Sequence, residues 1–185
     1  DDRRARAALR EFYLEQARSF VWGQQPTIAN FQPSQLLERP QEVGYVIQLA
    51  RLRELALEHL RDGAMLPPPR VDAPHAEIPI SRLSIYAGQR ETLKEYRMTV
   101  PLVLASAWRA ADGQIAIAVA SLADHSLTPT IHVDAARCGV SRGARFRPIG
   151  EADAGPIGVF EGRNLILRPA LGPRQACVWV TSPDP

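Results

Sequence analysis

Leu66-Pro67-Pro68-Pro69-Arg70 is the stretch of sequence that decides the fold. Consecutive prolines fix φ and lack backbone N–H donors, so this stretch predicts a stiff, extended connector. Residues 1–66 before it show the three- and four-residue apolar spacing of helices, and residues 76–181 after it show the alternation of short strands. This change of period predicts two units, a helix–strand–helix segment over 1–66 and a β-domain over 76–185, joined by a linker over 67–75.

The first unit is expected to contain two helices with one strand between them. Apolar residues at helical spacing predict a helix over 3–20. Residues 20–31 are partly apolar and interrupted by Gly23 and Pro26, which indicates a short buried strand and a loop. Residues 40–62 give the clearest helical pattern. Pro40 suits its first position, and Gly63 is expected as its left-handed stop.

The second unit is expected to be an antiparallel β-sandwich. Pro79 lies between two isoleucines, which favours an edge strand. Residues 98–109 predict a strand that ends in Trp108, and Asp112-Gly113 predicts the turn that follows. Residues 115–121 alternate large apolar residues with alanine. With the remaining apolar runs this makes about seven short strands. The predicted fold class is therefore α+β, a short helical segment followed by an antiparallel β-sandwich.

Composition narrows the classes of function. The chain has 185 residues, of which 45% are apolar and 23% charged, so it can bury an ordinary core. The net charge of +2 is evenly spread, which argues against a nucleic-acid partner. No apolar run reaches the length of a membrane span, so no membrane partner is expected. The charged start Asp1-Asp2-Arg3-Arg4 is unlike a signal peptide and indicates the middle of a longer protein, whose compartment stays open.

Two segments resemble parts of known proteins. Phe20-Val21-Trp22-Gly23-Gln24-Gln25-Pro26-Thr27-Ile28-Ala29-Asn30-Phe31, with the Arg- and Leu-rich helix after it, resembles the end of the catalytic barrel in poorly characterised glycoside-hydrolase-like proteins. Leu171-Gly172-Pro173-Arg174-Gln175-Ala176-Cys177-Val178-Trp179-Val180 resembles the last strand of the β-sandwich that follows many glycosidase barrels, and Trp108 to Ser121 resembles a strand pair of it. The resemblance implies a remnant of a β/α barrel over 1–66 and an accessory sandwich over 76–181.

The implied catalytic apparatus is not expected within this chain. A complete barrel needs ~250 residues, and glycoside hydrolysis needs two carboxylates about 5–10 Å apart. Residues 20–31 contain no Asp or Glu. No catalytic residue, metal or cofactor is assigned, and the isolated chain is not expected to be an enzyme. We expect a non-catalytic C-terminal portion of a glycoside-hydrolase-like protein, whose partner is the missing barrel portion or a second copy of the chain. The alternative is a carbohydrate-binding β-sandwich module.

Trp22, Gln24, Gln25 and Asn30 are the candidate substrate-binding residues. An indole ring stacks on the face of a sugar, and amide side chains both donate to and accept from hydroxyl groups. The competing interpretation places Trp22 in the core and lets the amides satisfy the loop backbone. Trp108 and Trp179 lie within apolar strands and are expected in the core, which argues against an aromatic platform on the sandwich.

The other polar groups are expected to be structural or solvated. A metal site needs three or four convergent ligands, and no group of residues supplies them. The pairs considered are His132 with Asp134, Asp124 with His125, and Glu151 with Asp153. Cys138 and Cys177 are expected to be separate small hydrophobes, although their pairing stays open. The helical segment is expected to expose apolar surface that a barrel would cover, at Val21, Ile28, Val46, Ile47 and Leu57.

Overall fold

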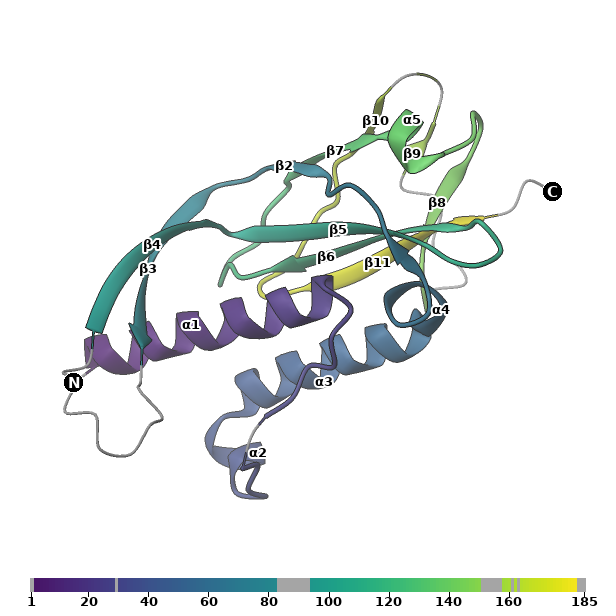
Figure 1. The fold of residues 1–185 in the computed structure, drawn as a ribbon. Helices are drawn as coiled ribbons and strands as arrows, with labels where there is room; N and C mark the ends of the chain where they lie inside the picture. Colours follow the sequence, from purple (N-terminus) through teal and green to yellow (C-terminus); the bar gives the residue numbers. More distant parts are fainter. Residues whose placement is uncertain are drawn as a thin grey trace.

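The computed structural model describes residues 2–28, 30–82, 94–150, 158–160, 162 and 164–182. The described residues form an α+β fold in which two long helices, a six-stranded sheet and a three-stranded sheet lie in successive layers (Figure 1). The helices are α1 (Asp2–Val21), α2 (Gln35–Glu38), α3 (Pro40–Leu55), α4 (Leu57–Leu60) and α5 (Ala135–Cys138). The α+β class with antiparallel sheets confirms the expectation from the sequence.

All strand pairings among the described residues are antiparallel. The six-stranded sheet has the order β1 (Ala64–Met65), β5 (Val103–Arg109), β6 (Ile115–Ser121), β11 (Ala176–Ser182), β8 (Arg145–Pro148) and β9 (Gly158–Val159). The three-stranded sheet has the order β10 (Asn164–Leu167), β7 (Thr130–Asp134) and β2 (Arg70–Asp72). A separate two-stranded sheet pairs β3 (His75–Arg82) with β4 (Lys94–Pro101).

The strand β6 lies at the centre of the molecule, and every one of its residues is buried. Ile115, Ile117 and Val119 point to the core between the six-stranded and three-stranded sheets, where they meet residues of β7 and β10. The alanines at 116, 118 and 120 point to the core beneath α1 and α3, where they meet Phe20 and Leu49. The predicted alternation is confirmed. Alanine on one face lets a helix lie close to the strand, because each side chain there adds only a methyl group.

The helices and the sheet share one core, and the proline connector contributes to the sheets. The apolar side of α1 packs on β5 and β6, and α3 packs on β11. Ala64 of β1 pairs with Arg109, and Val71 of β2 pairs with Ile131. The connector therefore carries the chain from one sheet to the other, and within the Pro-rich linker over 67–75 residues 70–72 form the strand β2.

The segment 20–31 is not a buried strand. The helix α1 continues to Val21, and a turn at Gly23, with φ +73°, reverses the chain. Residues 24–28 run on as an extended segment that belongs to none of the described sheets (Figure 1). An extended segment becomes a strand only when a partner supplies the ladder of hydrogen bonds.

The predicted helix over 40–62 is interrupted. Pro40 is its first residue, as predicted, but α3 ends at Leu55 and Ala56 has φ −110° and ψ 26°. The short α4 follows. Gly63 is not left-handed; a side chain there would strike the carbonyl oxygens of His59 and Arg109, so the close approach of helix to sheet requires glycine.

The predicted strand over 98–109 is two strands. The strand β4 ends at Pro101 and β5 begins at Val103, so the chain changes sheet at Leu102. The Leu102 N–H donates to the carbonyl of Pro74, and the Leu102 carbonyl accepts from Leu122. These bonds hold the bend, which the apolar run alone does not reveal.

The expectations for aromatic and apolar residues are partly confirmed. Trp108 and Trp179 are 7% and 4% exposed and lie in the two cores. Cys138 and Cys177 are both free of a disulfide. Of the residues expected to be exposed, Val21 and Val46 are buried and Ile28 and Leu57 are half-buried, because α1 and α3 pack on the sheet and on each other. Only Ile47 is exposed.

Candidate functional site

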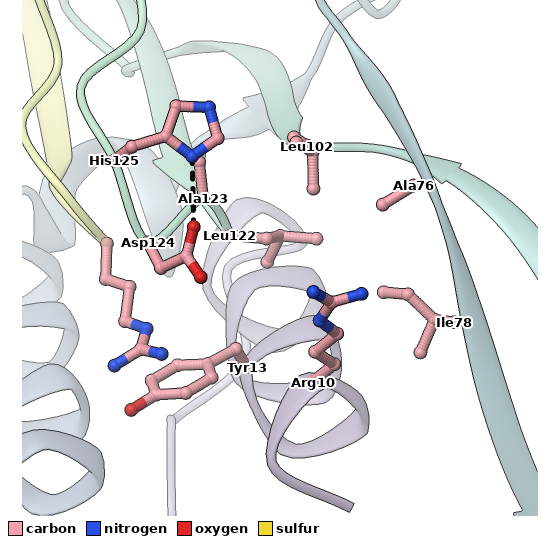
Figure 2. Close-up of a pocket in the computed structure, with 10 residues that line it drawn as sticks. Arg10, Tyr13, Ala76, Ile78, Leu102, Leu122, Ala123, Asp124 and His125 are labelled. Carbon is pink, nitrogen blue, oxygen red and sulfur yellow. Dashed lines mark hydrogen bonds and ion pairs between the residues drawn. The ribbon is translucent and has the colours of Figure 1, made fainter. Parts of the chain in front are cut away.

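A cavity of about 250 Å³ lies between α1, the strand β3 and the loop after β6 (Figure 2). Its polar side chains come from three distant parts of the chain: Arg10, Tyr13, Asp124, His125 and Arg174. Its apolar wall is formed by Ala76, Ile78, Leu102, Leu122 and Ala123. A second cavity of about 410 Å³ lies against α3 and shares Asp124 and Arg174 with the first.

Backbone hydrogen bonds bring the three segments together. Arg10 and Tyr13 are three residues apart on α1, so they lie on the same side of the helix. The Arg174 N–H donates to the carbonyl of Ala123 over 2.7 Å, which places the loop before β11 beside the loop after β6. Leu127 and Leu171 exchange backbone hydrogen bonds and close the same pair of loops. These bonds fix the backbone of Asp124 and the backbone of Arg174 relative to each other.

Arg174 lies between the two cavities and is held in an unusual conformation. Its φ is +49°, in the left-handed region that residues with a Cβ rarely adopt. The guanidinium lies 4.1 Å from the centre of the Tyr13 ring, and its Nη1 donates to the Gln41 amide oxygen over 2.6 Å. The Nε of Arg174 is buried with no hydrogen-bond partner among the described residues. The guanidinium is thus fixed in place with donor capacity left over.

Two tyrosines continue the site toward α3. The Tyr13 hydroxyl is buried and has no hydrogen-bond partner in the described part of the chain. Burial raises the pKa of Tyr13, and the nearby Arg174 partly offsets the rise. Tyr45 packs edge-on against Tyr13, with ring centres 5.2 Å apart, and its hydroxyl donates to the carbonyl of Ser121 over 3.2 Å. Burial raises the pKa of Tyr45 as well, so both phenols stay neutral, and the Tyr13 O–H is left with an unused donor.

Asp124 and His125 stand at the rim of the cavity. The Nδ1 of His125 lies 3.0 Å from the Oδ1 of Asp124, and this hydrogen bond lowers the pKa of the Asp124 carboxyl. Arg10 reaches into the cavity toward Leu122 and Ile78 in Figure 2. Arg10 makes no hydrogen bond or ion pair with any residue that the structure describes. One carboxylate therefore faces two guanidiniums, and the site has an excess of donors and of positive charge.

The candidate residues Trp22, Gln24, Gln25 and Asn30 lie elsewhere, in the loop after the C-terminal end of α1. Trp22 is 51% exposed, with the Arg18 guanidinium 4.9 Å from its ring centre, so the interpretation of Trp22 as a core residue is wrong. The Gln25 amide oxygen accepts from the Arg53 guanidinium over 3.0 Å. Gln24 and Asn30 are exposed, and Asn30 has φ +55°.

His132 and Asp134 contact different partners and do not form a common site. His132 lies 2.8 Å from the Asp72 carboxylate of β2, whereas Asp134 accepts from the Arg137 N–H and caps α5. Glu151 and Asp153 lie outside the described residues. Among the described residues, no group of three or more His, Cys, Asp or Glu side chains is arranged to hold a metal ion.

The sequence pointed to Asp124 and His125 only as a neighbouring pair, and it did not single out Arg10, Tyr13 or Arg174. Tyr13 occupies the apolar stripe of a helix, which gives it the pattern of a core residue. Arg174 follows Pro173 in a loop, where its left-handed backbone leaves no mark on the sequence.

No protein-family model matches this chain, and no curated protein matches it. None of the helices in the described part of the chain combines the length and apolar character needed to cross a membrane.

Proposed function

We propose that this chain is the non-catalytic C-terminal portion of a glycoside-hydrolase-like protein and that its helical layer packs against a catalytic barrel. The observation that carries the proposal is the unpaired extended segment 24–28. In Figure 1 this segment runs back from the end of α1 along α3, while α1 and α3 lie side by side and point the same way. A helix, a returning extended segment and a second parallel helix are the elements that end a β/α barrel.

The backbone of this segment has unused hydrogen-bonding groups. Within the described residues, no hydrogen bond is formed by the backbone N–H of Gln25, Thr27 or Ile28. From the described residues, the Thr27 carbonyl accepts a hydrogen bond from the Gln16 side chain alone, over 3.0 Å. Such a row of free backbone groups is a template for a neighbouring strand. A barrel strand on this edge would complete the ladder.

Exposed apolar side chains gather in the same part of the chain. Six of the eight large apolar side chains that are exposed among the described residues belong to residues 22–55. They are Trp22, Phe31, Leu36, Leu37, Ile47 and Leu55. Leu37 is 88% exposed. This concentration in the helical layer supports a role in packing against a further domain.

Hydrogen exchange at the segment 24–28 tests the proposal. This chain is compared with the longer polypeptide that includes the residues encoded ahead of Asp1. We expect the amides of Gln25, Thr27 and Ile28 to exchange rapidly in the chain alone and slowly in the longer form, because the added strand protects them. The amides of β6 serve as the control, since they are buried in both forms. Equal exchange at 24–28 in both forms, or a reading frame without strand–helix repeats ahead of Asp1, contradicts the proposal.

The exposure of Trp22 favours one alternative function, carbohydrate binding at the loop 22–31. A sugar that stacks on the open part of the indole would shift its fluorescence, while Trp108 and Trp179 are buried and respond little. Titration with a panel of soluble oligosaccharides, repeated with Trp22→Ala, tests it. A shift that disappears in Trp22→Ala supports binding, and a parent protein that shows no shift excludes it for those sugars.

A further inference from the structure

We propose that the cavity between α1 and β3 is a binding site for a small organic carboxylate that carries an apolar group. The balance of hydrogen-bonding groups is the first argument. Arg10 brings a guanidinium without a partner among the described residues, and Arg174 brings a second that is already aimed by Gln41 and Tyr13. Asp124 is the carboxylate that lines the cavity, and its Oδ1 is already bonded to His125. Donor groups therefore outnumber acceptor oxygens among the lining residues, and a carboxylate ligand would supply further acceptors.

The charge of the site also favours a carboxylate ligand. Among the lining residues, the guanidiniums of Arg10 and Arg174 outnumber the carboxylate of Asp124, so the cavity has a net positive charge. A planar guanidinium matches the two oxygens of a carboxylate and binds them in parallel. Arg10 makes no hydrogen bond with a described residue, so it is the primary contact in our proposal. Arg174 contributes through its charge and through its remaining donors.

The aliphatic wall of the cavity favours a ligand that carries an apolar group beside its carboxylate. Ile78 and Leu122 are 1% and 8% exposed, and with Ala76 and Leu102 they make an aliphatic surface beside Arg10. An inorganic anion would leave this surface in contact with water. A ligand with a hydrocarbon group next to its carboxylate covers it, and burial of that group adds affinity. The cavity volume of about 250 Å³ is below the range of drug-sized sites, so the ligand is small.

The conformation of Arg174 supports a site that the fold maintains. A residue other than glycine at φ +49° costs stability, and such residues persist where the surrounding structure holds them. Here the bond to Ala123 fixes the backbone, and Gln41 and Tyr13 fix the side chain. The strained residue is thus the one that carries a guanidinium to the junction of both cavities.

Binding of benzoate, monitored by NMR chemical shifts with calorimetry, tests the proposal. We expect a Kd of about 1 mM, with shifts at Arg10, Leu122 and Asp124. Acetate lacks the apolar group and benzyl alcohol lacks the charge, so both should bind at least about tenfold more weakly. Inorganic phosphate is the fourth probe. Phosphate that binds as tightly as benzoate, or benzyl alcohol that does, overturns the proposal.

Charge variants distinguish this site from non-specific binding. Arg10→Gln should weaken benzoate at least about tenfold, and Asp124→Asn should strengthen it a few-fold, because the first removes the ion pair and the second removes a repelling charge. Arg10 and Asp124 are exposed, so neither change should disturb folding. The matched control is Arg51→Gln, an exposed arginine on α3 that lines neither cavity. Arg10→Gln that binds like the parent, or no binding by the parent at 20-fold the expected Kd, refutes the site. Either result leaves the proposed packing against a barrel untouched.

Discussion

Gly23 and Gly44 are two glycines of the helical part of the chain with opposite surroundings. Gly23 has φ +73°, and a Cβ there would strike the carbonyl oxygen of Leu60 and lie 3.0 Å from the Trp108 ring. Gly44 lies within α3 and has no atom within 4 Å of the place of its Cβ. One position needs glycine and the other only tolerates it.

Alanine substitution should therefore have opposite signs at these two positions. Gly23→Ala should lower the free energy of unfolding by about 1–3 kcal/mol, because it adds both strain and a clash. Gly44→Ala should raise it by about 0.5–1 kcal/mol, since alanine loses less conformational freedom in a helix. Urea denaturation of both variants measures the changes. A stability loss of equal size in both would mean that the turn at Gly23 is not constrained as described.

His59 is a second residue whose surroundings predict a measurable effect. It is 4% exposed, its Nε2 has no hydrogen-bond partner among the described residues, and burial lowers its pKa below the usual 6.5. The unfolded chain then binds a proton more readily than the folded one. The resulting stability is present above pH 6.5 and is lost as the pH falls through the lowered pKa.

We expect the urea midpoint to fall between pH 7.5 and pH 5.5 and to fall less in His59→Gln, which removes the titrating group. The comparison of the two proteins at both pH values isolates the contribution of this side chain. If parent and variant lose the same stability over this range, His59 is not the group responsible.

At the scale of single elements, the alanine face of β6 sets the distance between helix and sheet. Ala118 is fully buried beneath α1 and α3 and lies opposite Ser106 and Val178 on the neighbouring strands. Ala118→Leu should cost about 1–3 kcal/mol, because the added carbons force the helices outward. Ala111→Leu in the exposed turn before β6 is the control, with an expected change within about 0.5 kcal/mol. Thermal denaturation of both variants measures the difference, and equal melting temperatures would contradict the close packing.

The same strand explains which elements the sequence predicts well. The alternation in β6 is visible because its two faces meet different cores, and α1 is visible because one side of it is apolar. Residues 24–28 misled the prediction because strand formation depends on a partner that the segment itself does not specify. The bend at Leu102 also lies within a continuous apolar run, and bonds to Pro74 and Leu122 determine it.

The residues of the cavity could not be predicted from the sequence for a related reason. Its charged residues are Arg10, Asp124 and Arg174, which come together only when the sheet brings β6 and β11 side by side beneath α1. Nothing local distinguishes Arg10 or Arg174 from the other arginines of the sequence. Convergence of this kind belongs to the tertiary fold, so only the neighbouring pair Asp124-His125 could be noticed in advance.

At the scale of the whole molecule, the distribution of exposed apolar residues predicts its behaviour in solution. Leu36 and Leu37 are 51% and 88% exposed in the helical layer, whereas Ile166 is 43% exposed on the three-stranded sheet. A double variant Leu36→Ser with Leu37→Ser should reduce binding of an apolar dye and reduce self-association in light scattering, because it removes two adjacent exposed apolar side chains. Ile166→Ser is the control and should leave both signals near those of the parent. If Ile166→Ser lowers both signals as much as the double variant does, self-association does not depend on the helical layer in particular.

The place of β11 in the six-stranded sheet has a consequence for biosynthesis. This strand is the last one described, yet it lies between β6 and β8 in the interior of the sheet. A ribosome makes the chain from the N-terminus, so β6 lacks its second neighbour until β11 has left the exit tunnel. During that interval one edge of β6 lacks its partner strand, and its unpaired backbone groups are a template for another strand. Emergence of β11, rather than synthesis of any earlier strand, is then the event that joins β6 to β8 in the sheet.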